Sequence, residues 1–485
     1  MLLKDLIKNI DDAEVIGDLN VEISDIKIDS NSVMDGTLYI ALKGKEHDGH
    51  SFIRVVENYG AKAIITEKKL DTTLCQVIVK DSRIAMCIVA KEFYNRPDEK
   101  VKFIGVIGTN GKTTSTHFIK SILDTAGKKC GLIGTLGYFY GSYKEESNLT
   151  TPDPLELYKI LAEMVENDVE YVVMEVSAHA IKLNKVYGIN FDVAIFTNFT
   201  QDHLDYFESM EEYKRTKLSF FDKNFCKYIL ANSDDEVGRE IINKYKGVIS
   251  YGIKNPADVF AVNIKKNENG SKFIINLFDC IYDVNLNMIG DFNISNALGA
   301  ATATALIGID CDKVVNGLEN LKCVSGRLEK VELKDYNVFI DYAHTPDGLY
   351  KALNTLKQSC KGKLICVFGC GGNRDKSKRK LMGKISGEVA DYTIVTSDNP
   401  RFEEPMDIIF EIEKGILEVT KNYILIQDRA EAIKYALESA SKLDYILIAG
   451  KGGENYQEIL GIKHQYNDKD KVKEIYKKLK GWKLI

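Results

Sequence analysis

Residues 105–114 read G-V-I-G-T-N-G-K-T-T, and the apolar run Phe103–Ile107 leads into the glycine turn of this stretch. An apolar strand that breaks into a glycine turn and then opens a helix is typical of loops that bind phosphate. Gly108 and Gly111 allow backbone N–H groups to turn toward phosphate oxygens, and Lys112 adds a point charge. The stretch therefore predicts a site for a nucleoside triphosphate.

The loop is a shortened variant, because Val106 stands five residues before Gly111, where the usual spacing has a glycine. A plain turn between a strand and a helix is the alternative, but Lys112 and two threonines add chemistry that such a turn does not need. Thr113 offers a hydroxyl to Mg2+. The loop residues predicted to contact ATP are Gly108, Thr109, Asn110, Gly111, Lys112, Thr113 and Thr114.

Strands alternate with helical stretches on both sides of the loop, which indicates an α/β fold with largely parallel sheets. Around the loop we expect strands at Phe103–Ile107, Cys130–Gly134, Glu170–Val176, Val193–Thr197 and Tyr228–Asn232. After a connector at 323–327 we expect strands at Val338–Asp341, Leu364–Phe368, Tyr392–Thr396, Tyr423–Ile426 and Tyr445–Ala449. Before a linker at 95–100 we expect strands at Val21–Ile28, Thr37–Leu42, Ala61–Thr66 and Leu74–Val79.

These blocks predict three domains in the 485 residues, which agrees with the usual length of a domain. Residues 1–98 are expected to form a small N-terminal α/β domain. Residues 99–325 are expected to form a central doubly wound sheet like that of phosphate-loop ATPases. Residues 326–485 are expected to form a Rossmann-like C-terminal domain.

The composition restricts the class of partner. The net charge is −6 and opposite charges are interspersed, which argues against a nucleic-acid partner. No apolar stretch reaches the roughly 18 residues that a membrane helix needs, and the N-terminal segment lacks a signal-peptide core. Ten scattered cysteines without zinc-like spacing predict reduced thiols. We expect a cytoplasmic protein without membrane insertion.

Polar side chains at two strand ends are candidates for metal binding. Glu175 lies inside the expected strand Glu170–Val176, and His203 follows Val193–Thr197. A carboxylate in a buried strand is costly unless it is paired or bound to metal, and parallel sheets bind ligands at their carboxyl ends. We therefore predict that Glu175 binds Mg2+. The alternatives are that Glu175 pairs with a nearby lysine or arginine and that His203 is bonded locally at a helix start.

A series of motifs runs in order along nearly the whole chain. They are D-S-N at 29, A-L-K-G-K at 41, D-G-H-S-F-I at 48, G-T-N-G-K-T-T at 108, L-T-T-P at 149, M-E-V-S-A-H-A at 174, N-F-T-Q-D-H-L-D-Y at 198, Y-K-R-T-K-L-S-F-F at 213, G-D-F-N-I-S-N-A at 290, S-G-R-L-E at 325, D-Y-A-H-T-P-D at 341, G-C-G-G-N-R-D at 369, D-N-P-R at 398 and G-K-G-G-E at 450. With this series the chain resembles the Mur ligases, ATP-dependent enzymes that form amide bonds in bacterial peptidoglycan synthesis. The resemblance is closest to the branch that makes UDP-N-acetylmuramoyl-tripeptide.

The resemblance implies a two-step reaction on small-molecule substrates, carried out by a monomer. The carboxylate of UDP-N-acetylmuramoyl-L-alanyl-D-glutamate attacks the γ-phosphate of ATP, and the amine of meso-2,6-diaminopimelate then displaces phosphate from the acyl phosphate. Cations would neutralise the charge that develops. The implied catalytic residues are Lys112, His203, Lys217 and Arg327. The implied Mg2+ ligands are Thr113, Glu175, His203 and Lys217, the last as a carbamate formed with CO2.

Further contacts are carried over from the family. Asn296 and Asp341 are implied to bind ATP, Asn296 at the adenine, with helix capping or core packing as the alternative for Asn296. A plain surface lysine is the alternative for Lys217, and an ion pair with Glu329 or Asp341 is the alternative for Arg327. The residues implied to bind the UDP-sugar peptide are Ser30, Thr150, Thr151, Ser177 and Lys185. Hydroxyls at turns are commonly caps, which is the alternative for the first four.

The D-N-P-R motif indicates which amine is added, because in the family it marks the diaminopimelate-adding enzymes. Diaminopimelate has a distal carboxylate that an arginine binds through two hydrogen bonds, and L-lysine has none. Glu454 would bind the distal ammonium. The implied amino-acid site is Arg374, Asp398, Asn399, Pro400, Arg401, Gly450 and Glu454. The alternative is that Arg401 caps a helix or pairs with Glu403.

The chain departs from the family pattern at four positions, namely Asn31, Lys185, Ser325 and Gly453, where arginine, arginine, proline and histidine are usual. These departures keep open a paralogue with a related substrate. A folylpolyglutamate synthetase is a second hypothesis, although it leaves the first hundred residues and D-N-P-R unexplained. A non-catalytic binding protein that kept the fold is a third, although the intact Lys112, Glu175 and Lys217 argue against it.

Overall fold

A computed structural model describes residues 1–44, 47–147 and 149–481 of the chain. The chain forms two compact units. The first holds Met1–Gly105, Lys128–Ala194 and Thr216–Tyr228, and the second holds Val106–Gly127, Ile195–Arg215 and Ile229–Ile485. Within the described residues, no helix has the length and apolar character needed to cross a membrane. All ten cysteines are free in the structure.

The N-terminal residues fold around a five-stranded sheet in the order β1-β5-β4-β3-β2. Its strands are β1 (Glu14–Ile16), β2 (Asp25–Lys27), β3 (Thr37–Ile40), β4 (Ala63–Thr66) and β5 (Cys75–Ile78), and its helices are α1 (Leu3–Ile7), α2 (Ile53–Asn58) and α3 (Ser82–Phe93). The expected strand Val21–Ile28 is too long. Its first half pairs with the N-terminus instead, since Leu3 N donates to Val21 O at 2.9 Å and Ile23 N donates to Met1 O at 2.8 Å.

The central sheet has eleven strands in the order β16-β15-β14-β13-β12-β11-β6-β10-β7-β8-β9. The expected strands appear as β6 (Lys102–Ile107), β7 (Cys130–Gly134), β10 (Tyr171–Val176), β11 (Phe191–Phe196) and β12 (Cys226–Asn232). The helices among them are α4 (Lys112–Thr125), α5 (Pro154–Glu166), α6 (Ala178–Lys182), α7 (Met210–Lys223) and α8 (Glu236–Lys244). Strand β10 runs parallel to β7, and β12 runs parallel to β13 (Ile249–Gly252).

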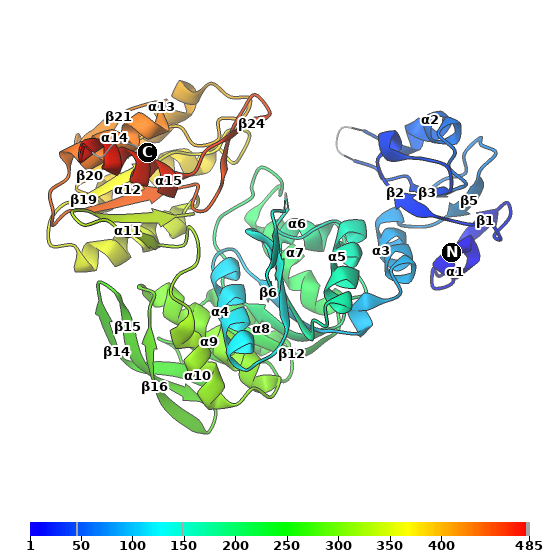
Figure 1. Ribbon diagram of the computed structural model, residues 1–485, viewed down its shortest axis with the longest axis horizontal. Coiled ribbons are helices and arrows are strands. Elements are labelled where there is room, and N and C mark those ends of the chain that lie inside the picture. The colour runs from blue at the N-terminus through cyan, green and yellow to red at the C-terminus, as the bar shows by residue number, and fades with distance from the viewer. Residues whose placement is uncertain (45–46, 148, 482–485) are drawn as a thin grey trace. The chain divides into compact units, whose positions relative to one another are not determined.

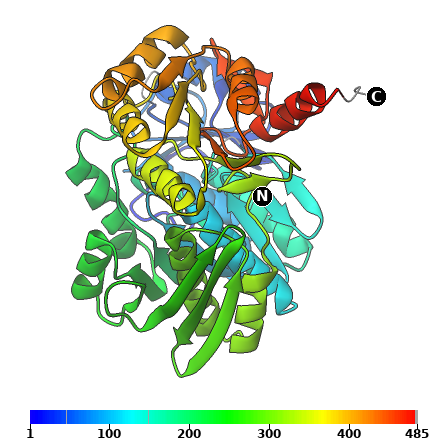
Figure 2. The ribbon, with the colours of Figure 1, turned by 90° about the vertical axis from the view of Figure 1, so that its left-hand side faces the viewer.

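Antiparallel ribbons at both edges of this sheet were not anticipated from the sequence. At one edge β14 (Val259–Asn267), β15 (Gly270–Leu277) and β16 (Cys280–Leu286) pair antiparallel, and Figure 2 shows them in green at the front. At the other edge, β8 (Gly137–Tyr140) and β9 (Tyr143–Glu145) form a hairpin. Helices α9 (Asp291–Leu306) and α10 (Cys311–Asn320) follow β16.

The C-terminal residues form a six-stranded sheet in the order β17-β18-β22-β19-β20-β21. The strands are β17 (Glu329–Val331), β18 (Asn337–Asp341), β19 (Leu364–Phe368), β20 (Tyr392–Val395), β21 (Tyr423–Leu425) and β22 (Tyr445–Ala449). All pair parallel except β17, which is antiparallel to β18. A small hairpin of β23 (Tyr456–Ile459) and β24 (Ile462–Gln465) follows.

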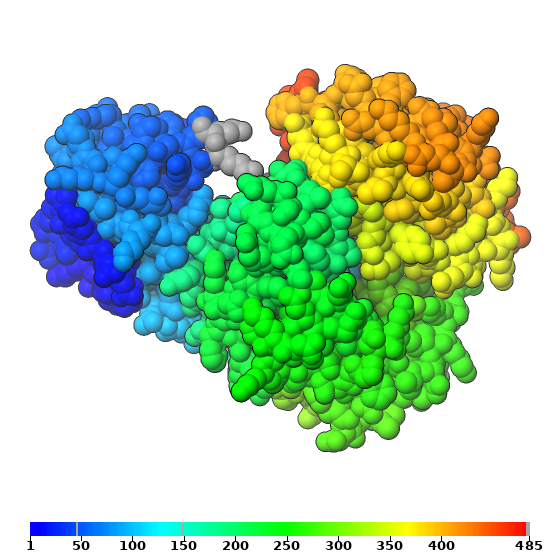
Figure 3. All heavy atoms as spheres, turned by 180° about the vertical axis from the view of Figure 1, so that it is seen from behind, coloured from blue at the N-terminus to red at the C-terminus, as the bar shows by residue number. Residues whose placement is uncertain are grey.

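Helices cover both faces of this C-terminal sheet, as Figure 1 shows. The helices are α11 (Pro346–Ser359), α12 (Ser377–Val389), α13 (Pro405–Ile416), α14 (Arg429–Ser439) and α15 (Asp468–Leu479). Core residues of α11, α12 and α13 pack on one face, and those of α14 and α15 pack on the other. Helices α12 and α13 pack against each other, and Figure 3 shows this part of the chain in yellow and orange. The expected α/β class with a Rossmann-like C-terminal part is confirmed.

Candidate active site

The predicted phosphate loop lies between β6 and α4. Gly108 and Gly111 have backbone φ angles of +149° and +90°. A Cβ atom on Gly108 would lie 1.9 Å from Thr197 Oγ1, and one on Gly111 would lie 2.4 Å from Asn296 Oδ1. The close approach of these two side chains therefore requires glycine at both positions. Asn296 is buried on α9 and packs directly on the loop.

Two predicted cations meet this loop within the second unit. Lys112 Nζ donates to the carbonyl oxygens of Gly108 at 3.0 Å and Thr109 at 2.8 Å. Arg327 Nη2 donates to Thr113 Oγ1 at 2.8 Å, and the guanidinium carbon lies 4.4 Å from the ring centroid of Tyr342. The structure thus brings Lys112, Thr113 and Arg327 to the N-terminus of α4, where the helix dipole favours an anion.

Asp341 orders the connector that carries Arg327. Its carboxylate accepts hydrogen bonds from Leu328 N at 2.6 Å and Ala343 N at 2.8 Å. Burial raises the pKa of Asp341, although the positive charge of Arg327 opposes the rise. Glu329 accepts from Gly326 N at 2.9 Å. Arg327 therefore contacts Thr113 and not Glu329, which was one alternative partner. The contact of Asp341 with ATP stays a prediction.

Glu175 is buried in the first unit, at the end of β10. Its Oε1 accepts from Thr135 N at 2.9 Å, and its Oε2 accepts from Thr135 Oγ1 at 3.1 Å. Thr135 Oγ1 also lies 3.1 Å from Thr150 Oγ1. The alternative of a lysine or arginine partner is wrong, because a threonine holds this carboxylate. Thr135 was missed from the sequence, where nothing links it to a strand end 40 residues away.

The residues predicted to bind the UDP-sugar peptide form part of the same network. Thr151 Oγ1 donates to Glu175 O at 2.8 Å and accepts from Ser177 N at 3.0 Å. Ser177 caps α6 by accepting from Ala180 N at 3.2 Å. Lys185 Nζ lies 2.9 Å from Asp153 Oδ1. Thr150, Thr151 and Ser177 thus gather beside Glu175.

Two further residues of the first unit are buried. Lys217 on α7 is only 1% exposed, so the alternative of a plain surface lysine is wrong. Ser30, in the turn Ser30–Ser32 capped by Asp29, is 8% exposed. Both positions agree with binding roles but do not test them.

His203 lies in the second unit beside a carboxylate that sequence reasoning did not select. Its Nε2 is 3.3 Å from Asp202 Oδ2, and His344 Nε2 is 3.5 Å from the same oxygen. Lys378 Nζ is 4.0 Å from Asp202 Oδ1. Burial alone would raise the pKa of Asp202, yet these neighbouring charges hold the pKa well below its usual range. His203 therefore makes the local contact that the alternative predicted, and its role toward Mg2+ stays a prediction.

The predicted amino-acid site lies at the carboxyl ends of β22, β19 and β20, which are adjacent in the sheet. Arg374 follows β19, Asp398–Arg401 follow β20, and Gly450–Glu454 follow β22. A Cβ atom on Gly371 would lie 2.9 Å from Arg401 Nη1 and 3.6 Å from Arg374 Cγ. The two predicted arginines therefore converge on one glycine.

Each of the ionic residues of this site has a protein partner. Arg401 Nε donates to Glu458 Oε2 at 3.0 Å and Nη1 donates to Gly372 O at 2.8 Å, so the alternative of an Arg401–Glu403 pair is wrong. Arg374 Nη1 lies 3.3 Å from Asp205 Oδ2.

Glu454 is held by Asn399 and by a buried lysine. Its Oε2 accepts from Lys451 Nζ at 2.8 Å and from Asn399 Nδ2 at 3.0 Å. Gly450 has a φ of +111°, and a Cβ atom there would lie 2.5 Å from Asp398 Oδ2. The G-K-G-G-E turn and the D-N-P-R turn are thus joined by side chains.

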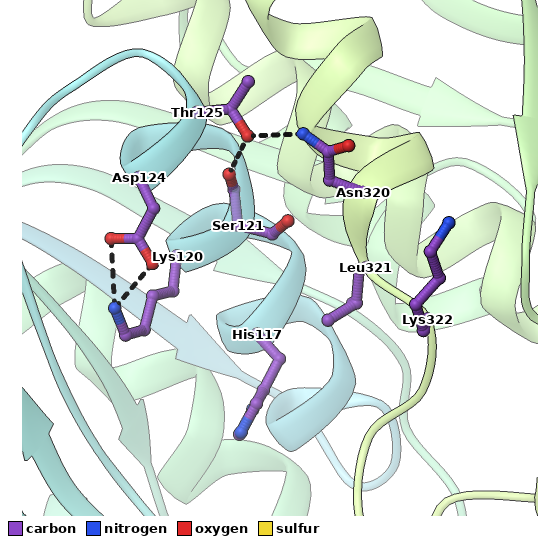
Figure 4. A pocket seen from close by; sticks show the side chains of 8 residues that line it. All are labelled: His117, Lys120, Ser121, Asp124, Thr125, Asn320, Leu321 and Lys322. Carbon is purple, nitrogen blue, oxygen red and sulfur yellow. Dashed lines mark hydrogen bonds and ion pairs between the residues drawn. The ribbon is translucent and has the colours of Figure 1, made fainter. Parts of the chain in front are cut away.

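A depression of about 450 Å³ lies elsewhere, between α4 and the segment that follows α10 (Figure 4). Its lining is held by local bonds such as Lys120 Nζ to Asp124 Oδ2 at 2.7 Å and Asn320 Nδ2 to Thr125 Oγ1 at 3.1 Å. None of the predicted site residues lines it.

A phosphate loop with two cations at its helix, together with a Rossmann-like sheet whose strand ends carry arginines, defines an α/β protein suited to a nucleoside triphosphate and a second anionic ligand. Three family models match the chain: the Mur ligase family catalytic domain over residues 22–106, the Mur ligase middle domain over 106–304 and the Mur ligase glutamate ligase domain over 326–452. The chain belongs to the Mur ligase family.

Individual relatives are similar to this chain over nearly its full length. The UDP-N-acetylmuramoyl-L-alanyl-D-glutamate–2,6-diaminopimelate ligase 1 of Clostridium acetobutylicum is 44% identical, covering 99% of this chain and 100% of that protein. A solved structure of a ligase of the same name is 28% identical with a TM-score of 0.70 and covers 99% of both chains. The MurF ligase of Thermotoga maritima in complex with ADP shares the fold, with a TM-score of 0.64 at 21% identity over 96% of this chain and 99% of that one.

Proposed function

We propose that this chain is an ATP-dependent amide ligase that adds meso-2,6-diaminopimelate to UDP-N-acetylmuramoyl-L-alanyl-D-glutamate in peptidoglycan precursor synthesis. The observation that carries the proposal is the convergence of Arg374 and Arg401 on Gly371 at the strand ends of the C-terminal sheet. Two arginines and an acid, Glu454, carried by neighbouring strand ends of one sheet, suit an amino acid with a distal carboxylate and a distal ammonium. The 44% identity to a relative of that name supports the same substrate.

The first step of the proposed reaction takes place at the phosphate loop. Lys112 and Arg327 would bind the β- and γ-phosphates and offset the charge that develops as the substrate carboxylate attacks. In both residues the present hydrogen bonds are to the loop itself, at 2.8 to 3.0 Å, so phosphate oxygens would compete with Thr109 O and Thr113 Oγ1 for these donors. Asn296 and Asp341 are proposed to contact the rest of ATP.

A magnesium ion would lower the charge on the phosphates when bound. Its proposed ligands are Thr113, Glu175, His203 and Lys217 as a carbamate. The hydroxyl and carboxylate donors fit a hard cation. Lys217 is only 1% exposed, and a carbamate there would be an anionic oxygen ligand, whereas an ammonium would repel the metal.

In the second step the amine of diaminopimelate attacks the acyl phosphate. Arg401 and Arg374 would hold the distal carboxylate, and Glu454 would accept hydrogen bonds from the distal ammonium in competition with Lys451. Asp398, Asn399, Pro400 and Gly450 would shape the site. Ser30, Thr150, Thr151, Ser177 and Lys185 are proposed to bind the UDP-sugar peptide. Because the reaction consumes ATP and a nucleotide-linked precursor, we also propose a cytoplasmic location.

The test is a product assay by mass spectrometry with ATP, the UDP-linked dipeptide and one amino acid at a time. We expect incorporation of meso-diaminopimelate with a kcat/KM far above that of L-lysine, ornithine or LL-diaminopimelate. A kcat/KM for L-lysine equal to that for meso-diaminopimelate would overturn the role of Arg401. Amide formation from a folate substrate instead of the UDP-linked dipeptide would overturn the function.

A further inference from the structure

The two loops that carry Arg374 and Arg401 are interlaced. Gly372 N donates to Asn399 O at 2.9 Å, and Phe402 N donates to Asn373 Oδ1 at 3.0 Å. A Cβ atom on Gly372 would lie 1.9 Å from Pro400 O. The loop after β19 (369–375) and the loop after β20 (397–403) therefore touch backbone to backbone, and neither can move alone.

Arg379, in the first turn of α12, forms hydrogen bonds to Gly371 in the loop after β19 and to Glu403 in the loop after β20. Its Nη1 and Nη2 donate to the two carboxylate oxygens of Glu403, each at 2.9 Å, and Nη2 also donates to Gly371 O at 3.3 Å. One of these carboxylate oxygens is shared, because Asn373 N donates to Glu403 Oε1 at 2.5 Å. Arg379 is 0% exposed, so its guanidinium fork makes these charge-assisted hydrogen bonds away from bulk water.

Hydrogen bonds from Arg379 lower the pKa of Glu403 to about 2. Glu403 is therefore ionised at physiological pH and accepts the two hydrogen bonds from Arg379 as a carboxylate. Glu411 is a third partner, since it accepts from Arg379 Nη1 at 2.9 Å, but it lies on α13 and touches neither loop through this contact. Two of the three partners of the guanidinium, Glu403 and Gly371, thus belong to the segments that carry the site arginines.

We propose that Arg379 and Glu403 are positioning residues for amino-acid specificity, which hold Arg374 and Arg401 at the separation that a distal carboxylate requires. The inference rests on the proposed function. Neither residue reaches the ligand in this role. Arg379 contacts Gly371, on which both site arginines converge, and Glu403 lies two residues after Arg401. Loss of the fork would loosen the two loops that carry Arg374 and Arg401, while the phosphate loop keeps its own contacts.

The central experiment compares Arg379→Lys and Glu403→Gln with the unchanged enzyme. Lysine keeps the charge but loses the fork, and glutamine keeps the shape of Glu403 but loses its charge. We expect the KM for meso-diaminopimelate to rise by roughly tenfold or more in both variants. The KM for ATP and for the UDP-linked dipeptide should change by less than about twofold, because those ligands bind elsewhere. The ratio of kcat/KM for meso-diaminopimelate to that for L-lysine should fall by a similar factor.

Glu411→Gln is the matched control, because it removes a charged partner of the same guanidinium and leaves the loop contacts in place. It should lower the melting temperature as Arg379→Lys does and leave the KM for diaminopimelate unchanged. If the Arg379 variants do not fold, Asn373→Gly replaces them as the variant that weakens the contact between the two loops. It removes the bond to Phe402 N, and glycine accepts the φ of +52° at this exposed position. It should raise the same KM selectively.

The inference is overturned if Arg379→Lys and Glu403→Gln lower stability but leave the KM for diaminopimelate within twofold, or if all three KM values rise together. Arg401→Ala, measured alongside, separates this failure from that of the proposed function. If Arg401→Ala raises the KM for diaminopimelate and the Arg379 variants do not, only the positioning role is wrong. If Arg401→Ala has no effect either, the assignment of the amino-acid site is wrong.

Discussion

Replacing Arg401 by lysine tests the amino-acid site with the smallest change in charge. Arg401 Nε donates to Glu458 Oε2 at 3.0 Å and Nη1 donates to Gly372 O at 2.8 Å. Two of the three guanidinium nitrogens are thus fixed by the protein. The orientation of the Arg401 guanidinium is therefore set before a ligand binds. A lysine ammonium sits on a flexible stem and cannot keep both contacts and also bind a carboxylate through two parallel hydrogen bonds.

The size of the effect follows from the hydrogen bond that lysine cannot make. The backbone φ of +51° at this position is as unfavourable for lysine as for arginine, so the difference lies in the side chain. One charge-assisted hydrogen bond contributes about 1.5–3 kcal/mol. Removal of one such bond to the substrate carboxylate corresponds to a fall in kcat/KM of roughly 10- to 150-fold. A larger fall is expected for Arg401→Ala, which also leaves Glu458 without its partner.

The assay measures phosphate release at saturating ATP and UDP-linked dipeptide, with meso-diaminopimelate or L-lysine varied. The fall should appear for diaminopimelate only, because lysine has no distal carboxylate for Arg401 to bind. Circular dichroism and the melting temperature check that the variant is folded. A fall of less than about threefold for diaminopimelate, or an equal fall for both amino acids, would refute the proposed contact.

Three further predictions concern other parts of the chain. Lys217→Ala should reduce ADP release under saturating substrates by at least about 100-fold, and unchanged release would remove its proposed role as a metal-binding carbamate. Arg429→Met should lower the free energy of unfolding by about 3–5 kcal/mol in urea titration, because it leaves the fully buried Asp468 without its ion pair; a loss below about 1 kcal/mol would contradict this. The pKa of Glu403 is lowered to about 2, so its ionised form contributes stability at any pH above its unfolded value of 4.5. The penalty of Glu403→Gln should therefore be constant from pH 7 to 5 and shrink as the pH falls from 4.5 toward 2, whereas a penalty that grows in acid would show the opposite sign.

Short sequence patterns were sufficient to predict the glycine turn after β6 and the buried parallel strands. The glycine turn between β6 and α4 was predicted correctly because an apolar strand, two glycines and a lysine occupy consecutive positions. The Rossmann-like sheet was predictable because each buried parallel strand is a short apolar run. The ribbon at 259–286 was missed since its strands are half exposed and carry lysine and asparagine, so that their pattern resembles a polar connection.

Contacts between residues that lie far apart in the sequence could not be predicted from these patterns. Glu175 was selected correctly as a buried carboxylate, yet its partner Thr135 could not be identified, because a hydrogen bond across two strands leaves no periodic signal. Arg379 was overlooked for a similar reason. It stands in the run K-S-K-R-K, which is typical of a solvated basic helix face, and only the packing of the folded chain shows that Arg379 and its neighbour Lys378 are buried.

The connector and the G-K-G-G-E turn approach each other closely at Gly326. A Cβ atom on Gly326 would lie 1.9 Å from Gly453 N and 2.3 Å from Gly452 C, so the connector and the G-K-G-G-E turn meet without any side chain between them. The contact is made by the backbone N of Gly453, which any residue at this position would have, so the requirement for glycine falls on position 326. Arg327 follows Gly326 directly, and Glu454 follows Gly453 directly. The cation that reaches Thr113 and the acid proposed to bind the incoming amine are therefore each one residue from a contact that has no space to adjust. A shift of either turn must displace the other, which links the phosphate end and the amine end of the proposed reaction through two glycines.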